Sequence, residues 1–161
     1  MKTITYDEFI TFEPCWLETP QGRRRLKYYA KKRERWAALD ILALKHISAE
    51  DRLWAVLREE LIDAIILHEF ACRCAERALS KIDNPDPRSV NAVKTKRMWM
   101  AGNATGDELA AARDAARDTA WVAAWDAAQV AAWAAAWVAA RDVEREWQVN
   151  ELIKMLEENV A

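Results

Sequence analysis

The last third of the chain contains no residue that ordinarily ends a helix. Neither glycine nor proline occurs after Gly106. Alanine, the best helix former, fills 17 of the 31 residues from 110 to 140. One unbroken helix from there to the C-terminus would be about 80 Å long, much longer than a compact domain of this size. The sequence therefore predicts a long Ala/Trp-rich helix that breaks near Ala140 to Trp147. The alternative is a helix that projects or assembles with copies of itself.

A four-residue repeat runs through this segment. Every fourth residue forms a near palindrome, made up of Arg113, Arg117, Trp121, Trp125, Gln129, Trp133, Trp137, Arg141 and Arg145. Four residues advance a helix by 400°, so the stripe turns about 40° at each step and its tryptophans face more than one neighbour. Packing of large rings between alanines in a helix hairpin or oligomer is the simpler interpretation. The alternative is that Trp beside Arg at each end stacks on a flat ligand and holds its phosphate.

Composition limits the remaining possibilities. The chain has 161 residues, only 3 glycines and 4 prolines, and a formal net charge of -2. We expect an all-α fold with residues 1–161 in a single helical domain. The small net charge provides no strong field for nucleic acid or an acidic membrane, so we expect neither as a partner. Asp126, near the middle of residues 120–140, argues against a membrane span there.

Local signals place the other helices. Residues 5–18 are expected to form a short helix broken near Pro14, followed by a turn at TPQG. A capping pattern at Ser48, with no glycine or proline before Pro85, predicts one helix over about 49–81. The apolar run LIDAIILHEFAC predicts that this helix is buried on most sides. Asp86 with Pro87 begins a helix that ends at Gly102, and a capping box begins the next one.

A basic segment lies near the N-terminus. RRRLKYYAKKRER, residues 23–35, holds eight basic side chains against one acid, with two tyrosines between them. This pattern is typical of a solvated helix face whose arginine stems cover apolar surface. Its charge density leaves anion binding as the alternative.

No catalytic or metal-binding motif is complete. HEFAC, residues 68–72, comes close to the zinc-protease pattern H-E-x-x-H but ends in Cys72, which leaves two ligands at most. We therefore interpret His68 as a core histidine and expect no metal and no cofactor. Asp63 stands among apolar residues, and if buried it needs a partner such as Arg58 or Arg73. No nucleophile elbow or glycine-rich phosphate loop is present, so we expect a protein that is not an enzyme.

Three parts of the chain together resemble a known group. With LWAVLREELIDAIILHEFACRCAERAL, NPDPRSVNAVKTKRMW and the Trp/Ala repeat, the chain resembles small helical proteins of bacteriophages and prophages that are labelled immunity proteins. The resemblance implies a helical, non-catalytic protein that neutralises something hostile.

These observations lead to two functional hypotheses. In the first, the chain is a counter-defence protein of a phage or mobile element that sequesters an anionic nucleotide immune signal in Arg/Trp-lined pockets of a homo-oligomer. In the second, it is an immunity protein that binds a toxin or defence protein directly. The acids in MKTITYDEFI and the odd number of cysteines indicate a cytoplasmic protein, and the resemblance implies that the cytoplasm is that of a bacterial host. The candidate ligand-binding residues are Arg113, Arg117, Trp121, Trp137, Arg141, Arg145, His68 and Arg73.

Overall fold

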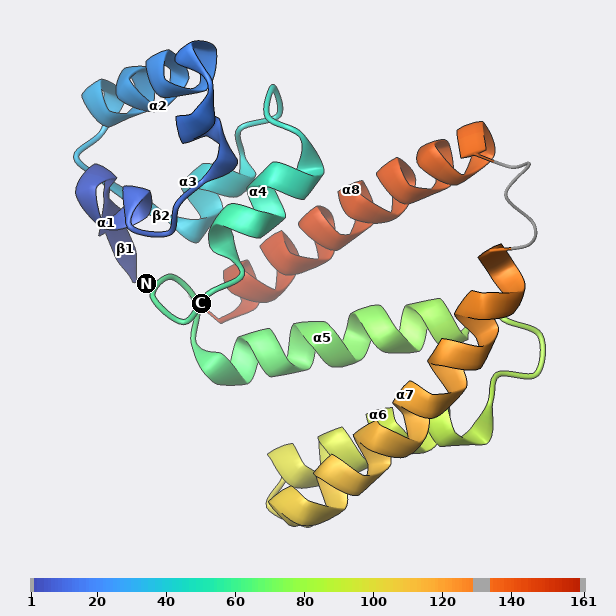
Figure 1. Cartoon of the computed structure of the whole chain (residues 1–161). Coiled ribbons are helices and arrows are strands. Elements are labelled where there is room, and N and C mark those ends of the chain that lie inside the picture. The colour runs from blue at the N-terminus through green and yellow to red at the C-terminus, as the bar shows by residue number, and fades with distance from the viewer. Residues whose placement is uncertain (1, 129–133, 160–161) are drawn as a thin grey trace. The chain divides into compact units, whose positions relative to one another are not determined.

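The structure is a computed structural model that describes the backbone of residues 2–128 and 134–159 and the side chains of residues 2–117 and 141–159. Helices dominate it, which confirms the all-α class (Figure 1). The elements are β1 Thr3–Thr5, α1 Tyr6–Ile10, the 3-10 helix η1 Cys15–Glu18, α2 Pro20–Lys32, β2 Arg35–Ala37, α3 Ala38–Leu42, α4 Ala49–Val56, α5 Ala64–Leu79, α6 Pro87–Met100, α7 Gly106–Ala128 and α8 Ala134–Glu158. None of the described helices is long and apolar enough to cross a membrane.

The chain divides into two compact units. The first contains the described residues up to Ala64 and those from Ile153 onward, and the second contains residues 65–152. The buried core of the first unit includes Leu42, Leu53 and Val56, each at most 2% exposed. In the second unit Val149 and Leu152 of α8 are the most deeply buried described side chains. The division falls within α8, so this helix contributes residues to both cores.

A two-stranded sheet in the first unit was not predicted. β1 pairs antiparallel with β2, and Ile4 lies opposite Trp36. The Arg35 side chain adds hydrogen bonds to the hydroxyl and carbonyl oxygens of Thr3, at 2.8 and 2.7 Å. Each strand has only three residues, so this pairing depends on contacts between distant parts of the chain rather than on a local pattern.

The expected turn at TPQG is instead the start of α2. The Thr19 hydroxyl accepts a hydrogen bond from the Gly22 amide, and Pro20 takes the first helical position, where its missing N–H costs nothing. Gly22 is required by close packing: a Cβ there would lie 2.2 Å from the carbonyl oxygen of Trp16 in η1. The turn prediction was wrong because proline and glycine serve helix initiation and close approach here.

The single helix predicted over about 49–81 is divided in two. α4 ends at Val56 and α5 begins at Ala64, although the Ser48 cap is present as predicted. In the segment between them, Arg58 donates to the carbonyls of Trp54 and Ala55, at 2.7 and 2.9 Å. Leu61 and Ile62 are both buried. The local hydrogen bonds of Arg58 therefore satisfy carbonyls at the end of α4, and two adjacent apolar side chains are buried beyond it, with no breaking residue in the sequence.

Asp63 is not buried, so the condition under which it would need Arg58 or Arg73 does not arise, whereas the expected burial of the next helix was wrong. Asp63 is 65% exposed, and its partner is Lys2, whose Nζ lies 2.8 Å from the carboxylate. The Lys2 hydrogen bond and charge lower the pKa of Asp63. α5 is not buried on most sides, since only Phe70 and Cys72 are buried in it and Ile65 is 55% exposed.

The second unit begins its helices as predicted, but the C-terminal break does not lie where the sequence placed it. The Asp86 carboxylate accepts from the Arg88 amide, and Thr105 and Glu108 form the reciprocal hydrogen bonds of a capping box. α6 ends at Met100 and packs along α7 (Figure 1). α8 runs without interruption through residues 140–147, so the break predicted there was wrong.

Candidate functional site

The structure describes the two ends of the Arg/Trp stripe. The side chains of Trp121, Trp125, Gln129, Trp133 and Trp137 lie outside the described residues. Its outer arginines are described: Arg113 and Arg117 are exposed on α7, and Arg141 is exposed on α8. Arg145 is half-buried and donates to the side-chain oxygen of Gln148 at 3.2 Å.

Arg73 is held between two carboxylates. Its guanidinium lies 3.0 Å from Glu69 on α5 and 2.5 Å from Glu151 on α8. Hydrogen bonds to Glu151 and Glu69 raise the pKa of Arg73. An anionic ligand would have to compete with both carboxylates, so this arginine joins helices in the structure and does not extend the stripe.

His68 leads to a second group of residues. Its ring meets the indole of Trp99 edge to face, with centroids 5.3 Å apart. Lys96 and Trp99 lie one helical turn apart on α6, and the Lys96 ammonium is 3.9 Å from the centroid of the same indole. All three side chains are half-buried. The structure therefore gathers an imidazole, an ammonium and an indole where α5 meets α6.

Arg113 of α7 acts electrostatically on this group. Burial lowers the pKa of Lys96, and the positive charge of Arg113 lowers it further. Within the described part of the chain, neither Lys96 nor Arg113 forms an ion pair with a carboxylate. We call His68, Lys96, Trp99 and Arg113 the cationic corner.

The neighbouring Arg97 shows the opposite arrangement. It donates to Glu69 at 2.7 Å and to Glu76 at 2.6 Å, and these hydrogen bonds raise its pKa. The nearby carboxylates Glu69 and Glu76 are engaged by Arg97, and the net effect of burial and of Arg113 on Lys96 is a lowered pKa. An anion placed between Lys96 and Arg113 would relieve their repulsion and raise the pKa of Lys96.

Sequence reasoning found two members of the corner and missed two. His68 and Arg113 were candidate residues, whereas Lys96 and Trp99 were not. Their signal is the i,i+3 spacing within KTKRMW, which places a cation and an indole on one helix face.

The first unit has a pocket of a different character. It contains about 580 Å³ of empty space, including its open mouth, and is walled by aromatic residues that include Phe9, Trp16, Tyr29 and Trp36. Arg52 also lines it and is 3% exposed, with Nη1 donating to the Leu42 carbonyl at 2.8 Å. The walls are almost wholly apolar and offer few partners to the sugar and phosphates of a nucleotide.

The cysteines of α5 are poorly suited to metal binding or to nucleophilic chemistry. Cys72 is buried, and its sulfur is 4.0 Å from that of Met100. Burial raises the pKa of Cys72 and raises that of Cys74 to about 11, so both thiols stay protonated near neutral pH. Among the described residues, no three His, Cys, Asp or Glu side chains gather as a metal site would require.

No family model matches this chain, and no curated protein or solved structure is similar to it. The resemblance to phage immunity proteins therefore stays a prediction from the sequence.

Proposed function

We propose that this protein is a non-catalytic binding protein that sequesters an anionic nucleotide at the cationic corner. The observation that carries the proposal is the placement of Lys96 on the face of Trp99, with Arg113 close enough to lower the lysine pKa. A phosphate would be attracted by the two cations, and the neighbouring aromatic rings would offer surfaces for a base. Arg117 lies one turn further along α7 and extends the positive surface.

The sequence resemblance supplies a biological setting for the proposal. A phage or mobile element gains from a protein that removes a nucleotide signal made by a host defence system. The corner is formed from three helices, and a second copy of the chain would add an opposite wall that encloses the ligand. The ligand is released intact, because no activated nucleophile accompanies the corner among the described residues.

The test measures depletion of free nucleotide. The full-length protein is incubated with a panel of cyclic and ADP-ribose-derived nucleotides, the free ligand is quantified, and the protein is then denatured to recover what it held. We expect depletion of at least one member and its recovery unchanged. Recovery of a cleaved nucleotide would make the protein an enzyme. Depletion of none, with tight binding of a toxin or defence protein, would favour the immunity alternative.

Two substitutions locate the site. Lys96→Met and Arg113→Met each remove one charge-assisted contact to phosphate, and each should weaken binding by about tenfold or more. Lys94→Met is the matched control, because Lys94 lies two residues earlier on α6 and is exposed. Equal affinity of Lys96→Met and Lys94→Met would remove the corner as the site.

The pH dependence follows from the lowered pKa of Lys96. Binding needs the ammonium form, so affinity should fall as pH rises through that pKa, at a lower pH than an ordinary lysine would give. In Arg113→Met the pKa rises toward its usual value, so the decline should move to higher pH. Titration of affinity between pH 7 and 10.5 measures this shift.

A further inference from the structure

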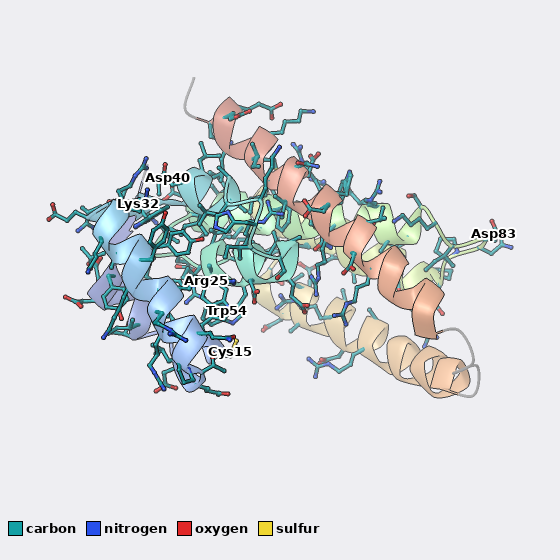
Figure 2. The ribbon with its side chains drawn as sticks, turned by 90° about the horizontal axis from the view of Figure 1, so that it is seen from above. Cys15, Arg25, Lys32, Asp40, Trp54 and Asp83 are labelled. Atoms are coloured by element: carbon teal, nitrogen blue, oxygen red, sulfur yellow. The ribbon has the colours of Figure 1, made fainter. Side chains whose placement is uncertain are left out.

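Helix α2 carries a strongly basic outer face. Side chains with exposed positive charge lie on the helix side away from Leu26, which is only 4% exposed. These cations span an arc of about 160° at 100° per residue. We define the basic face as these cations and the tyrosine among them, namely Arg24, Arg25, Lys27, Tyr28, Lys31 and Lys32. Figure 2 shows side chains extending from this helix, with Lys32 marking its C-terminal end.

Two carboxylates of the first unit pair with other cations of the segment. Arg33 pairs with Asp40, and Arg35 lies 3.7 Å from Glu8. Arg23 donates to the Leu17 carbonyl at 2.5 Å. Within the described part of the chain, no ion pair involves the cations of the basic face. Their charge is therefore available to a polyanion.

Tyr28 is exposed among these cations. It is 55% exposed, meets Tyr29 edge to face at 5.5 Å, and has the Lys32 ammonium 5.3 Å from its ring centroid. The ring is thus held in place by neighbours while part of it faces solvent. A row of cations with an interleaved aromatic ring is the combination that holds phosphates and stacks a base.

We propose that the basic face binds single-stranded nucleic acid, with its cations on the phosphates and Tyr28 against a base. An anionic membrane is a poorer match, because the face offers no apolar side chain besides Tyr28, and Leu26 of the same helix points into the core. The small net charge of the chain led us to expect no nucleic acid partner. That expectation rests on the net charge of the whole chain, whereas the cations of the basic face form no ion pair among the described residues.

The experiment uses the full-length protein and a fluorescein-labelled oligothymidylate of about 15 nucleotides, followed by anisotropy. We expect binding whose logarithm falls with the logarithm of salt concentration, with a slope of about -3.5 for five phosphate contacts on a single strand. Lys27→Gln with Lys31→Gln should weaken binding about tenfold and reduce the slope by about 1 to 1.5. Tyr28→Leu should weaken it at least about fivefold with the slope unchanged.

The control variant is Lys45→Gln with Lys94→Gln, which removes the same charge from exposed positions outside α2. Thermal melts verify that each variant is folded. The proposal is overturned if the α2 double variant binds like this control, or if the slope stays near zero. It is also overturned if phosphatidylserine vesicles or polyglutamate bind the protein more tightly than the oligonucleotide does. Because the oligonucleotide could also bind at the cationic corner, retention of binding in Lys96→Met is required.

Discussion

Helices α2 and α5 both carry several basic side chains. Among the described residues, those of α5 have carboxylate partners and those of the basic face of α2 have none. On α5, Arg73 and Arg77 meet Glu151 and Glu144 of α8, partners 78 and 67 residues further along the chain. On α2 the cations of the basic face have no such partners among the described residues. A basic residue in the sequence can therefore be a link between helices or an available charge, and what the fold places opposite it decides which.

The pKa values of the carboxylates that pair with these arginines show the effect of the pairing. Burial by itself raises the pKa of Glu69, but hydrogen bonds from Arg97 and Arg73 outweigh it, and the net pKa lies below the usual value. Arg97 likewise lowers the pKa of Glu76. These carboxylates stay ionised because the arginines stabilise their charge, so the arginines contribute to the stability of the second unit.

The largest expected change in stability comes from the close packing of α2 against η1, which holds the helix with its basic face outward. Gly22→Ala places a Cβ against the backbone of Trp16 and should cost about 2 to 3 kcal/mol of unfolding free energy, despite the higher helix propensity of alanine. Gly106→Ala is the control, since a Cβ there meets nothing within 4 Å. Urea denaturation of both variants measures the difference. A neutral Gly22→Ala would mean that η1 does not pack closely on α2.

The next effect compares the two kinds of cation directly. Arg97→Met leaves Glu69 and Glu76 without their main partner and should cost about 1 to 2 kcal/mol, less than a fully buried pair because the arginine is partly exposed. Arg24→Met makes the same chemical change on the basic face and should stay within about 0.5 kcal/mol. Equal costs in chemical denaturation at pH 7 would contradict the comparison.

The third prediction concerns acid. Glu69 and Glu76 have lowered pKa values in the fold, so their contribution is present above the unfolded value near 4.5 and is lost as pH falls through the folded value. The penalty of Arg97→Met should therefore shrink by about 1 kcal/mol between pH 7 and pH 3. The penalty of Arg24→Met should not change. Denaturation series at several pH values measure both, and a constant Arg97→Met penalty would exclude this linkage.

The smallest effect is on the basic face itself. Lys27→Gln with Lys31→Gln should change stability by less than about 0.5 kcal/mol, with a slight gain because like charges at i,i+4 repel each other. Thermal denaturation at low and high salt measures it, and any gain should disappear at high salt. A loss above about 1 kcal/mol would show that these lysines hold the fold together.

The fold class and three helix caps were read correctly from the sequence, whereas the local signal TPQG was read as a turn and is the start of α2. The all-α class followed from the scarcity of glycine and proline, and the caps at Ser48, Asp86 and Thr105 formed as predicted. Each cap is a hydrogen bond between residues two or three positions apart, so the local sequence contains both partners.

Tertiary structure decided the rest. The pairing of β1 with β2, the Lys2 partner of Asp63 and the contact of His68 with Trp99 all join residues that are far apart in the sequence. Residue types could suggest that Asp63 needs a cation or that a histidine lies near a tryptophan, but not which one. The energy of such a contact depends on distance and burial, and both are set only when distant segments pack together.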